Sequence, residues 1–229
     1  MAQLAEVLYL ITGALAAITL HESIKALVSY KLGDPLPKAR GRLTLNPINH
    51  FEPIGFICMI LTGYGWGKPV PTAAIYYKDR KKGTLLTYIS PSIANLLAGV
   101  SLSFLAHFVL VSVIYQNIGS AAIVQDTFLN ADSPAQLSER IVQNASFHSW
   151  GAVYRLLQAV AKANVAIAFF NIIPVYPLDG AKILALRLSP EQQIKSAAYE
   201  KIFQILLILA MFTGWVGMLL RPLQNVFIL

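Results

Sequence analysis

The first apolar stretch of the chain contains several side chains that could do chemistry. Residues 19–25 read TLHESIK, which places His21 and Lys25 four positions apart and Glu22 directly after the histidine. On a helix, residues four apart lie on the same face, so His21 and Lys25 would point in one direction. Polar residues inside a membrane segment are costly and are therefore candidates for function.

Lys25 determines which chemistry this group can perform. A zinc protease carries His-Glu-x-x-His at such a place, because two imidazoles one turn apart bind one metal ion and the glutamate activates its water. Lysine stands where the second histidine belongs, and an ammonium has three donors and no lone pair. We expect Lys25 to stay protonated and to take the cation's place, in ion pairs with Glu22 and Asp179. A plainer alternative is that His21 and Glu22 are a buried polar pair that packs helices together.

A second polar cluster follows the third long apolar run. Residues 171–180 read NIIPVYPLDG, in which Pro174 and Pro177 interrupt helical structure and Asp179 presents a carboxylate. The alternative role for Asp179 is a helix N-cap or a salt bridge with Lys182.

The composition indicates what surrounds both clusters. Hydrophobic residues make up 56% of the 229 residues and charged residues 13%, whereas soluble domains carry about 25% charged residues. Apolar runs at 85–115, 152–173 and 199–220 are long enough to cross a bilayer, and a run at 7–20 becomes so by continuing to residue 30. The predicted fold class is therefore an all-α polytopic membrane protein with about four transmembrane helices.

The region 31–84 cannot form one helix, because prolines and glycines interrupt it throughout. Its apolar piece at 54–66 is too short to cross a bilayer and fits a re-entrant or interfacial segment. Residues 64–71 are expected to form extended or turn structure against the bundle.

The loop charges give the expected orientation. Basic residues exceed acidic ones in 31–52, 76–84 and 174–198, while acidic residues prevail in 116–150. Because cytoplasmic loops are enriched in lysine and arginine, we expect the N-terminus and the polar loop 116–150 outside, and both clusters near the cytoplasmic side. The net charge of +7 fits these loops and contact with anionic lipid rather than nucleic acid. Residues 1–229 are expected to form a single membrane domain.

Four stretches of the chain resemble one family. They are HESIK at 21–25, GRLTLNP at 41–47 with its continuation HFEPIG at 50–55, SPSIANL at 90–96 and NIIPVYPLDG at 171–180. In this order and spacing they resemble the compact bacterial and archaeal site-2 proteases, which are intramembrane zinc metalloproteases, over residues 4 to about 188. The chain departs from the family pattern at Lys25, which replaces the second histidine of HExxH, and at Ser90, which replaces a glycine.

The resemblance implies a role for each matching residue. His21 and Asp179 would be zinc ligands, and Glu22 would be the general base that takes a proton from zinc-bound water. His50 is a possible substitute for the lost ligand, although a histidine there is also an ordinary feature of the family segment. Four positions would bind substrate, namely Asn95, Asn171, Pro174 and Pro177.

Three functions remain open from the sequence. An active enzyme would use zinc to hydrolyse a peptide bond in a transmembrane helix of a regulatory protein, in a bacterial or archaeal cell membrane with the site facing the cytoplasm. A pseudoprotease would need no cofactor and would bind or sequester membrane proteins through the same groove. A small ion or proton transporter would use the four side chains His21, Glu22, Lys25 and Asp179 as a relay.

Overall fold

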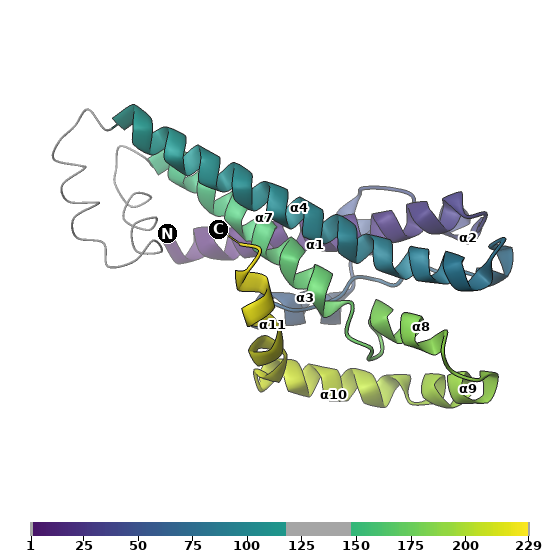
Figure 1. The fold of residues 1–229 in the computed structure, drawn as a ribbon. Coiled ribbons are helices and arrows are strands. Elements are labelled where there is room, and N and C mark those ends of the chain that lie inside the picture. Colours follow the sequence, from purple (N-terminus) through teal and green to yellow (C-terminus); the bar gives the residue numbers. More distant parts are fainter. Residues whose placement is uncertain (1, 118–147, 229) are drawn as a thin grey trace.

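Three long helices form the centre of the molecule. The computed structural model describes residues 2–117 and 148–228, and all regular secondary structure in these two ranges is helical. Helices α1 (Ala2–Lys31), α4 (Arg80–Asn117) and α7 (His148–Phe170) pack against one another, and Figure 1 shows α4 running beside α7. Each is long and apolar enough to cross a bilayer, which confirms three of the predicted spans.

Small residues allow the three helices to approach closely. A Cβ atom on Gly13 of α1 would lie 2.7 Å from the carbonyl oxygen of Ala159 on α7. A Cβ atom on Gly99 of α4 would lie 2.6 Å from the Val165 side chain of α7. Because membrane helices associate through close packing rather than through the hydrophobic effect, these contacts fix α1 and α4 against α7.

The predicted fourth crossing is a bent pair of helices in place of one straight helix. Helix α10 (Glu200–Phe212) and helix α11 (Trp215–Asn225) meet at an angle of 68°. Gly214 lies in the break and has a φ of 83°, a backbone conformation that glycine adopts without steric cost. The described ranges therefore contain three continuous candidate spans, or four if the bent pair counts as one.

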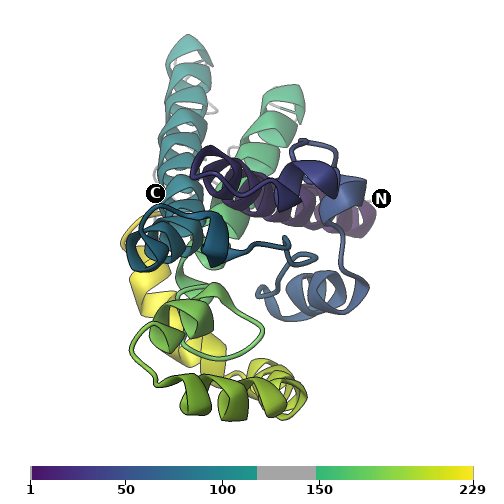
Figure 2. The ribbon, with the colours of Figure 1, turned by 90° about the vertical axis from the view of Figure 1, so that its right-hand side faces the viewer.

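The region between α1 and α4 consists of short elements, as the prolines and glycines predicted. These are α2 (Leu36–Ala39), η1 (Pro47–His50), α3 (Pro53–Thr62) and η2 (Ala74–Tyr76). Helix α3 has 10 residues, which is too short to cross a bilayer and agrees with the predicted non-spanning piece. Residues 64–73 have no regular secondary structure, and in Figure 2 the chain between α3 and α4 passes between α1 and α8.

Two short helices follow α7 and connect it to α10. They are α8 (Asp179–Ala185) and α9 (Pro190–Ala198). The buried side chains of Tyr64, Phe170, Leu178 and Leu207 belong to one apolar cluster that joins α7, the start of α8 and α10. This cluster holds the chain after α7 against the bundle. The predicted polar loop at 116–150 lies almost entirely outside the described residues, and the orientation in the membrane stays a prediction.

Candidate functional site

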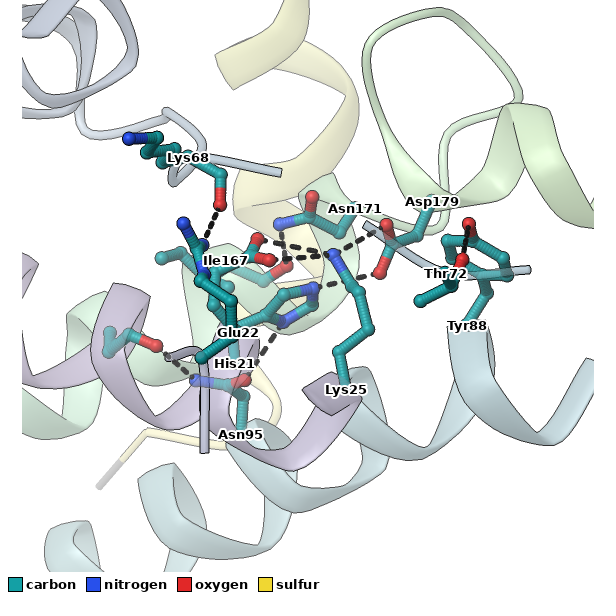
Figure 3. Close-up of polar contacts among 12 residues, drawn as sticks. His21, Glu22, Lys25, Lys68, Thr72, Tyr88, Asn95, Ile167, Asn171 and Asp179 are labelled. Carbon is teal, nitrogen blue, oxygen red and sulfur yellow. Dashed lines mark hydrogen bonds and ion pairs between the residues drawn. The ribbon is translucent and has the colours of Figure 1, made fainter. Parts of the chain in front are cut away.

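The two polar clusters of the sequence meet in one buried group of side chains (Figure 3). Helix α1 supplies His21, Glu22 and Lys25, and the first residue of α8 supplies Asp179. The Nε2 atom of His21 lies 3.0 Å from Oδ2 of Asp179. All four side chains are buried, so the group is shielded from bulk solvent.

Lys25 lies between the two carboxylates. Its Nζ atom is 2.8 Å from Oδ1 of Asp179 and 3.1 Å from Oε1 of Glu22. A second contact of 3.2 Å joins Nζ to Oε2 of Glu22, so both oxygens of that carboxylate bond the ammonium. Burial alone would raise the pKa of Asp179, but Lys25 and His21 together hold it below its usual range. Each buried charge therefore has an opposite charge in contact, which is the condition for burying ions at acceptable cost.

The turn after α7 is built so that Asp179 faces α1. Its backbone is closed by a hydrogen bond of 2.7 Å from the Gly180 amide to the Asn171 carbonyl. A Cβ atom on Gly180 would lie 2.1 Å from the carbonyl oxygen of Ile172, so only glycine fits there. The Asn171 side chain donates to the carbonyl of Ile167, one turn back on α7. The NIIPVYPLDG sequence thus determines where the carboxylate points.

Asn95 of α4 orients His21 from the other side of its ring. The Nδ2 atom of Asn95 donates to the Ala17 carbonyl at 3.0 Å and to Oδ1 of Asn164 at 2.7 Å. Its Oδ1 atom is therefore the acceptor for Nδ1–H of His21, at 3.0 Å. With Nδ1 protonated, the Nε2 atom of His21 faces the Asp179 carboxylate, so a proton or a metal ion has to lie between these two atoms.

A cavity of about 220 Å³ adjoins the buried charges. Of the predicted substrate-binding positions, Asn171 and Pro177 line it, whereas Asn95 is fully buried behind His21 and Pro174 is not among the lining residues. The walls come from α1, from residues 66–72, from α4, from the chain around α8 and from the start of α10. The lining residues include Glu22, Lys25, Trp66, Gly67, Thr72, Tyr88, Asp179, Lys182 and Glu200.

The segment after α1 holds the cavity wall in place. The guanidinium of Arg42 donates to the Lys68 carbonyl, and the Lys68 amide donates to the His50 carbonyl at 2.9 Å. Gly67 packs directly on α1, since a Cβ atom there would lie 2.9 Å from Cγ of Glu22. The sequence interpretation did not single out Arg42. Its position in the GRLTLNP stretch was the signal that could have revealed it.

His50 bonds its surroundings through one ring nitrogen, and its role as a substitute ligand stays a prediction. Its Nε2 atom lies 2.7 Å from the Thr44 carbonyl and 3.1 Å from Oγ of Ser23. Burial lowers the pKa of His50, so its ring is neutral at neutral pH. The Nε2 atom is thus engaged between α1 and the following loop, whereas Nδ1 is buried and has no hydrogen-bond partner in the part of the chain that the structure describes.

The side chains do not form a complete zinc site. Nε2 of His21 and Oδ2 of Asp179 are atoms that zinc accepts as ligands. The third position holds the ammonium of Lys25, which has no lone pair. Within the described ranges, no group of three or more His, Cys, Asp or Glu side chains is arranged to hold a metal ion.

The helical membrane core and the degenerate His-Glu-x-x-Lys group define a protein of the site-2 protease class. The chain matches the model of Peptidase family M50 over residues 4–213, and it belongs to that family. It is 29% identical over 218 residues to the protein named "Putative zinc metalloprotease YwhC" of Bacillus subtilis (strain 168). The matched region covers 95% of this chain and 86% of that protein. No solved structure matches the chain.

Proposed function

We propose that this protein is a non-catalytic member of the site-2 protease class that binds segments of other membrane proteins in the cavity beside Lys25. The observation that carries the proposal is the position of the Lys25 ammonium, 2.8 Å from Asp179 and 3.1 Å from Glu22. This ammonium takes the place of the metal between the two carboxylates that the family motif provides.

The charge balance supports the replacement of metal by lysine. Zinc would bring two positive charges to a site that contains the carboxylates of Glu22 and Asp179. The ammonium of Lys25 brings one positive charge, and a proton held between His21 and Asp179 brings the other. The buried group is then neutral without a metal, which low-dielectric surroundings strongly favour.

The same contacts oppose hydrolysis. A general base has to reach the proton that it accepts, through an oxygen atom that is free to do so. Both oxygens of Glu22 instead bond the Lys25 ammonium. Glu22 would have to lose this ion pair inside a buried site before it could activate water.

The cavity favours retained binding of an extended chain segment. Its wall at residues 66–72 has no regular secondary structure, Arg42 and His50 fix this wall at the Lys68 backbone, and Asn171 also lines the cavity. The backbone of such a wall offers hydrogen bonds to a client segment that has locally unwound from its helix. The proposed partners are therefore membrane proteins with an unstable or interrupted transmembrane helix.

Zinc-dependent peptidase activity on transmembrane helices is the second candidate. The family and the name of the Bacillus subtilis relative point to it. The 3.0 Å separation of His21 Nε2 and Asp179 Oδ2 also favours it, because these two atoms could share a cation in place of a proton. Such a site would have to bind zinc through two protein ligands while Lys25 gave up its ion pairs.

Zinc stoichiometry of the detergent-purified, full-length protein distinguishes the two functions. We expect no zinc in the unmodified protein, about one zinc per chain in Lys25→His, and none in Lys25→His/Asp179→Ala. Near one zinc per chain in the unmodified protein would overturn the lysine-for-metal proposal and support the peptidase.

Client binding needs its own test. A synthetic transmembrane peptide with a central Asn-Pro break should bind the unmodified protein more tightly than an uninterrupted poly-Leu helix. Asn171→Leu should remove this preference, while Lys195→Leu, an exposed change on α9 outside the cavity, should leave it intact. Equal binding of both peptides would contradict the proposed recognition of unwound segments.

A further inference from the structure

A second and larger cavity adjoins the apolar cluster, since Tyr64 and Ala166 belong to both. Its volume is about 380 Å³. The rings of Tyr64 and Phe170 pack with their centroids 5.7 Å apart, and Tyr64 also lines this cavity. The remaining walls come from α1, the end of α3, α7 and α11. They include Leu10, Ala14, Met59, Lys162, Arg221 and Gln224.

Two cations line this cavity without an acidic counterpart. Lys162 lies inside the candidate span Gly151–Phe170, and Arg221 lies on α11. Neither takes part in an ion pair with an acidic side chain of the described ranges, and no acidic residue is among those lining the cavity. By contrast, Arg155 on the same helix contacts Glu6 at 2.7 Å. Both residues are exposed, and Arg221 also bonds the Tyr64 hydroxyl. Cations in membrane segments are costly and normally meet a counter-charge, so an anion in this cavity would stabilise both.

The polar groups beside the two cations are also donors. The Oε1 atom of Gln224 accepts a hydrogen bond of 3.2 Å from the Tyr64 hydroxyl. Its Nε2 atom is buried and has no hydrogen-bond partner in the part of the chain that the structure describes. An ammonium, a guanidinium and an unsatisfied amide therefore line one space, and such a combination suits phosphate or carboxylate oxygens.

The size and surroundings of the cavity narrow the choice of ligand. A volume of about 380 Å³ falls within the range of small-molecule sites. It cannot admit a helix, which is about 10–12 Å across with its side chains. Helix α11 also exposes the apolar side chains of Met218, Leu219 and Leu223, along which an alkyl chain could lie. A membrane lipid fulfils both conditions, because its charged group is compact and its chains stay in the bilayer.

We infer that this cavity binds the phosphate group of an anionic phospholipid through Lys162, Arg221 and Gln224. The inference does not depend on the proposed function, since the cavity shares no lining residue with the site around Lys25. Tyr64 lies two positions before Trp66, which lines the cavity beside Lys25. A bound lipid would therefore also stabilise the start of the segment that forms the wall of that site.

The test measures lipid binding to the full-length protein in neutral detergent. Phosphatidylglycerol should raise the midpoint of thermal unfolding and remain bound in native mass spectrometry, while phosphatidylcholine should do neither. The variant Lys162→Gln/Arg221→Gln should bind phosphatidylglycerol more weakly, by about tenfold for each charge removed. Arg155→Gln is the matched control, because it removes a cation from α7 outside the cavity, and it should bind as the unmodified protein does.

Two further measurements separate lipid binding by charge from loss of fold and from binding of another acidic lipid. The charge-preserving variant Lys162→Arg/Arg221→Lys should retain binding, which separates loss of charge from loss of fold. Oleate tests the other source of an acidic head group. Stabilisation by oleate without phosphatidylglycerol would overturn the phospholipid assignment, as would equal loss of binding in Arg155→Gln and in the double Gln variant.

Discussion

The ammonium nitrogen of Lys25 lies 2.8 Å from Oδ1 of Asp179, although two other membrane-spanning helices lie between these residues in the sequence. This contact joins the HESIK motif on α1 to the NIIPVYPLDG motif, which ends in the first turn of α8. Lys25 is thus part of the buried group whose residues bind a metal ion in the family motif.

Removal of the Lys25 charge should strongly destabilise the protein. Lys25→Met keeps most of the length of the side chain but leaves Glu22 and Asp179 buried without a cation. We expect a loss of about 3–5 kcal/mol in the free energy of unfolding, measured by chemical denaturation in mixed micelles. Lys182→Met is the matched control, since Lys182 lines the cavity and stacks on the Tyr176 ring but bonds no carboxylate of the group. Equal losses in both variants would show that the ion pairs contribute nothing specific.

The bond between His21 and Asn95 should be energetically coupled to the bond between Asn95 and Asn164. Asn95→Ala removes the acceptor for His21 and a donor for Asn164, so we expect a loss of about 1–3 kcal/mol in unfolding free energy. In Asn164→Ala the same network is already broken, so the double variant should lose less than the sum of the single ones. Strict additivity in this double-mutant cycle would contradict the network.

Gly180 should tolerate no side chain. Gly180→Ala places a Cβ atom 2.1 Å from the Ile172 carbonyl oxygen, so the turn that carries Asp179 has to move. In the Lys25→His background, this change should abolish the zinc binding that the histidine confers. Gly217→Ala is the control, because its Cβ atom would approach only the flexible Arg221 side chain, at 3.3 Å. Retention of zinc in Gly180→Ala would show that the turn does not position the carboxylate.

Arg42 should hold the cavity wall. Arg42→Gln removes the buried guanidinium that donates to the Lys68 carbonyl. The amide hydrogens of residues 64–73 should therefore exchange faster than in the unmodified protein. Hydrogen exchange with mass spectrometry measures this directly. Arg40→Gln, at an exposed position two residues earlier, should leave the exchange of this segment unchanged. Unaltered exchange in Arg42→Gln would mean that other contacts hold the wall.

Local features of this protein can be predicted from its sequence alone. The length of the apolar runs predicted α1, α4 and α7, because bilayer thickness sets the length of a spanning helix. The spacing of His21, Glu22 and Lys25 predicted one helical face, since helix geometry is local. The order of the four motifs identified the family. The charge of Lys25 already indicated that a metal ligand is missing.

Which atoms come into contact depends on the packing of the helices. Whether Lys25 contacts Asp179 depends on how α1 packs against the chain after α7, and no short window of sequence contains that information. Packing also placed Asn95 behind His21 instead of in the cavity beside Lys25. It brought Arg42 to the backbone of Lys68. It placed Lys162 and Arg221 in the walls of one cavity. The bend between α10 and α11 was equally hidden, because a continuous apolar run satisfies a straight span and a broken one alike.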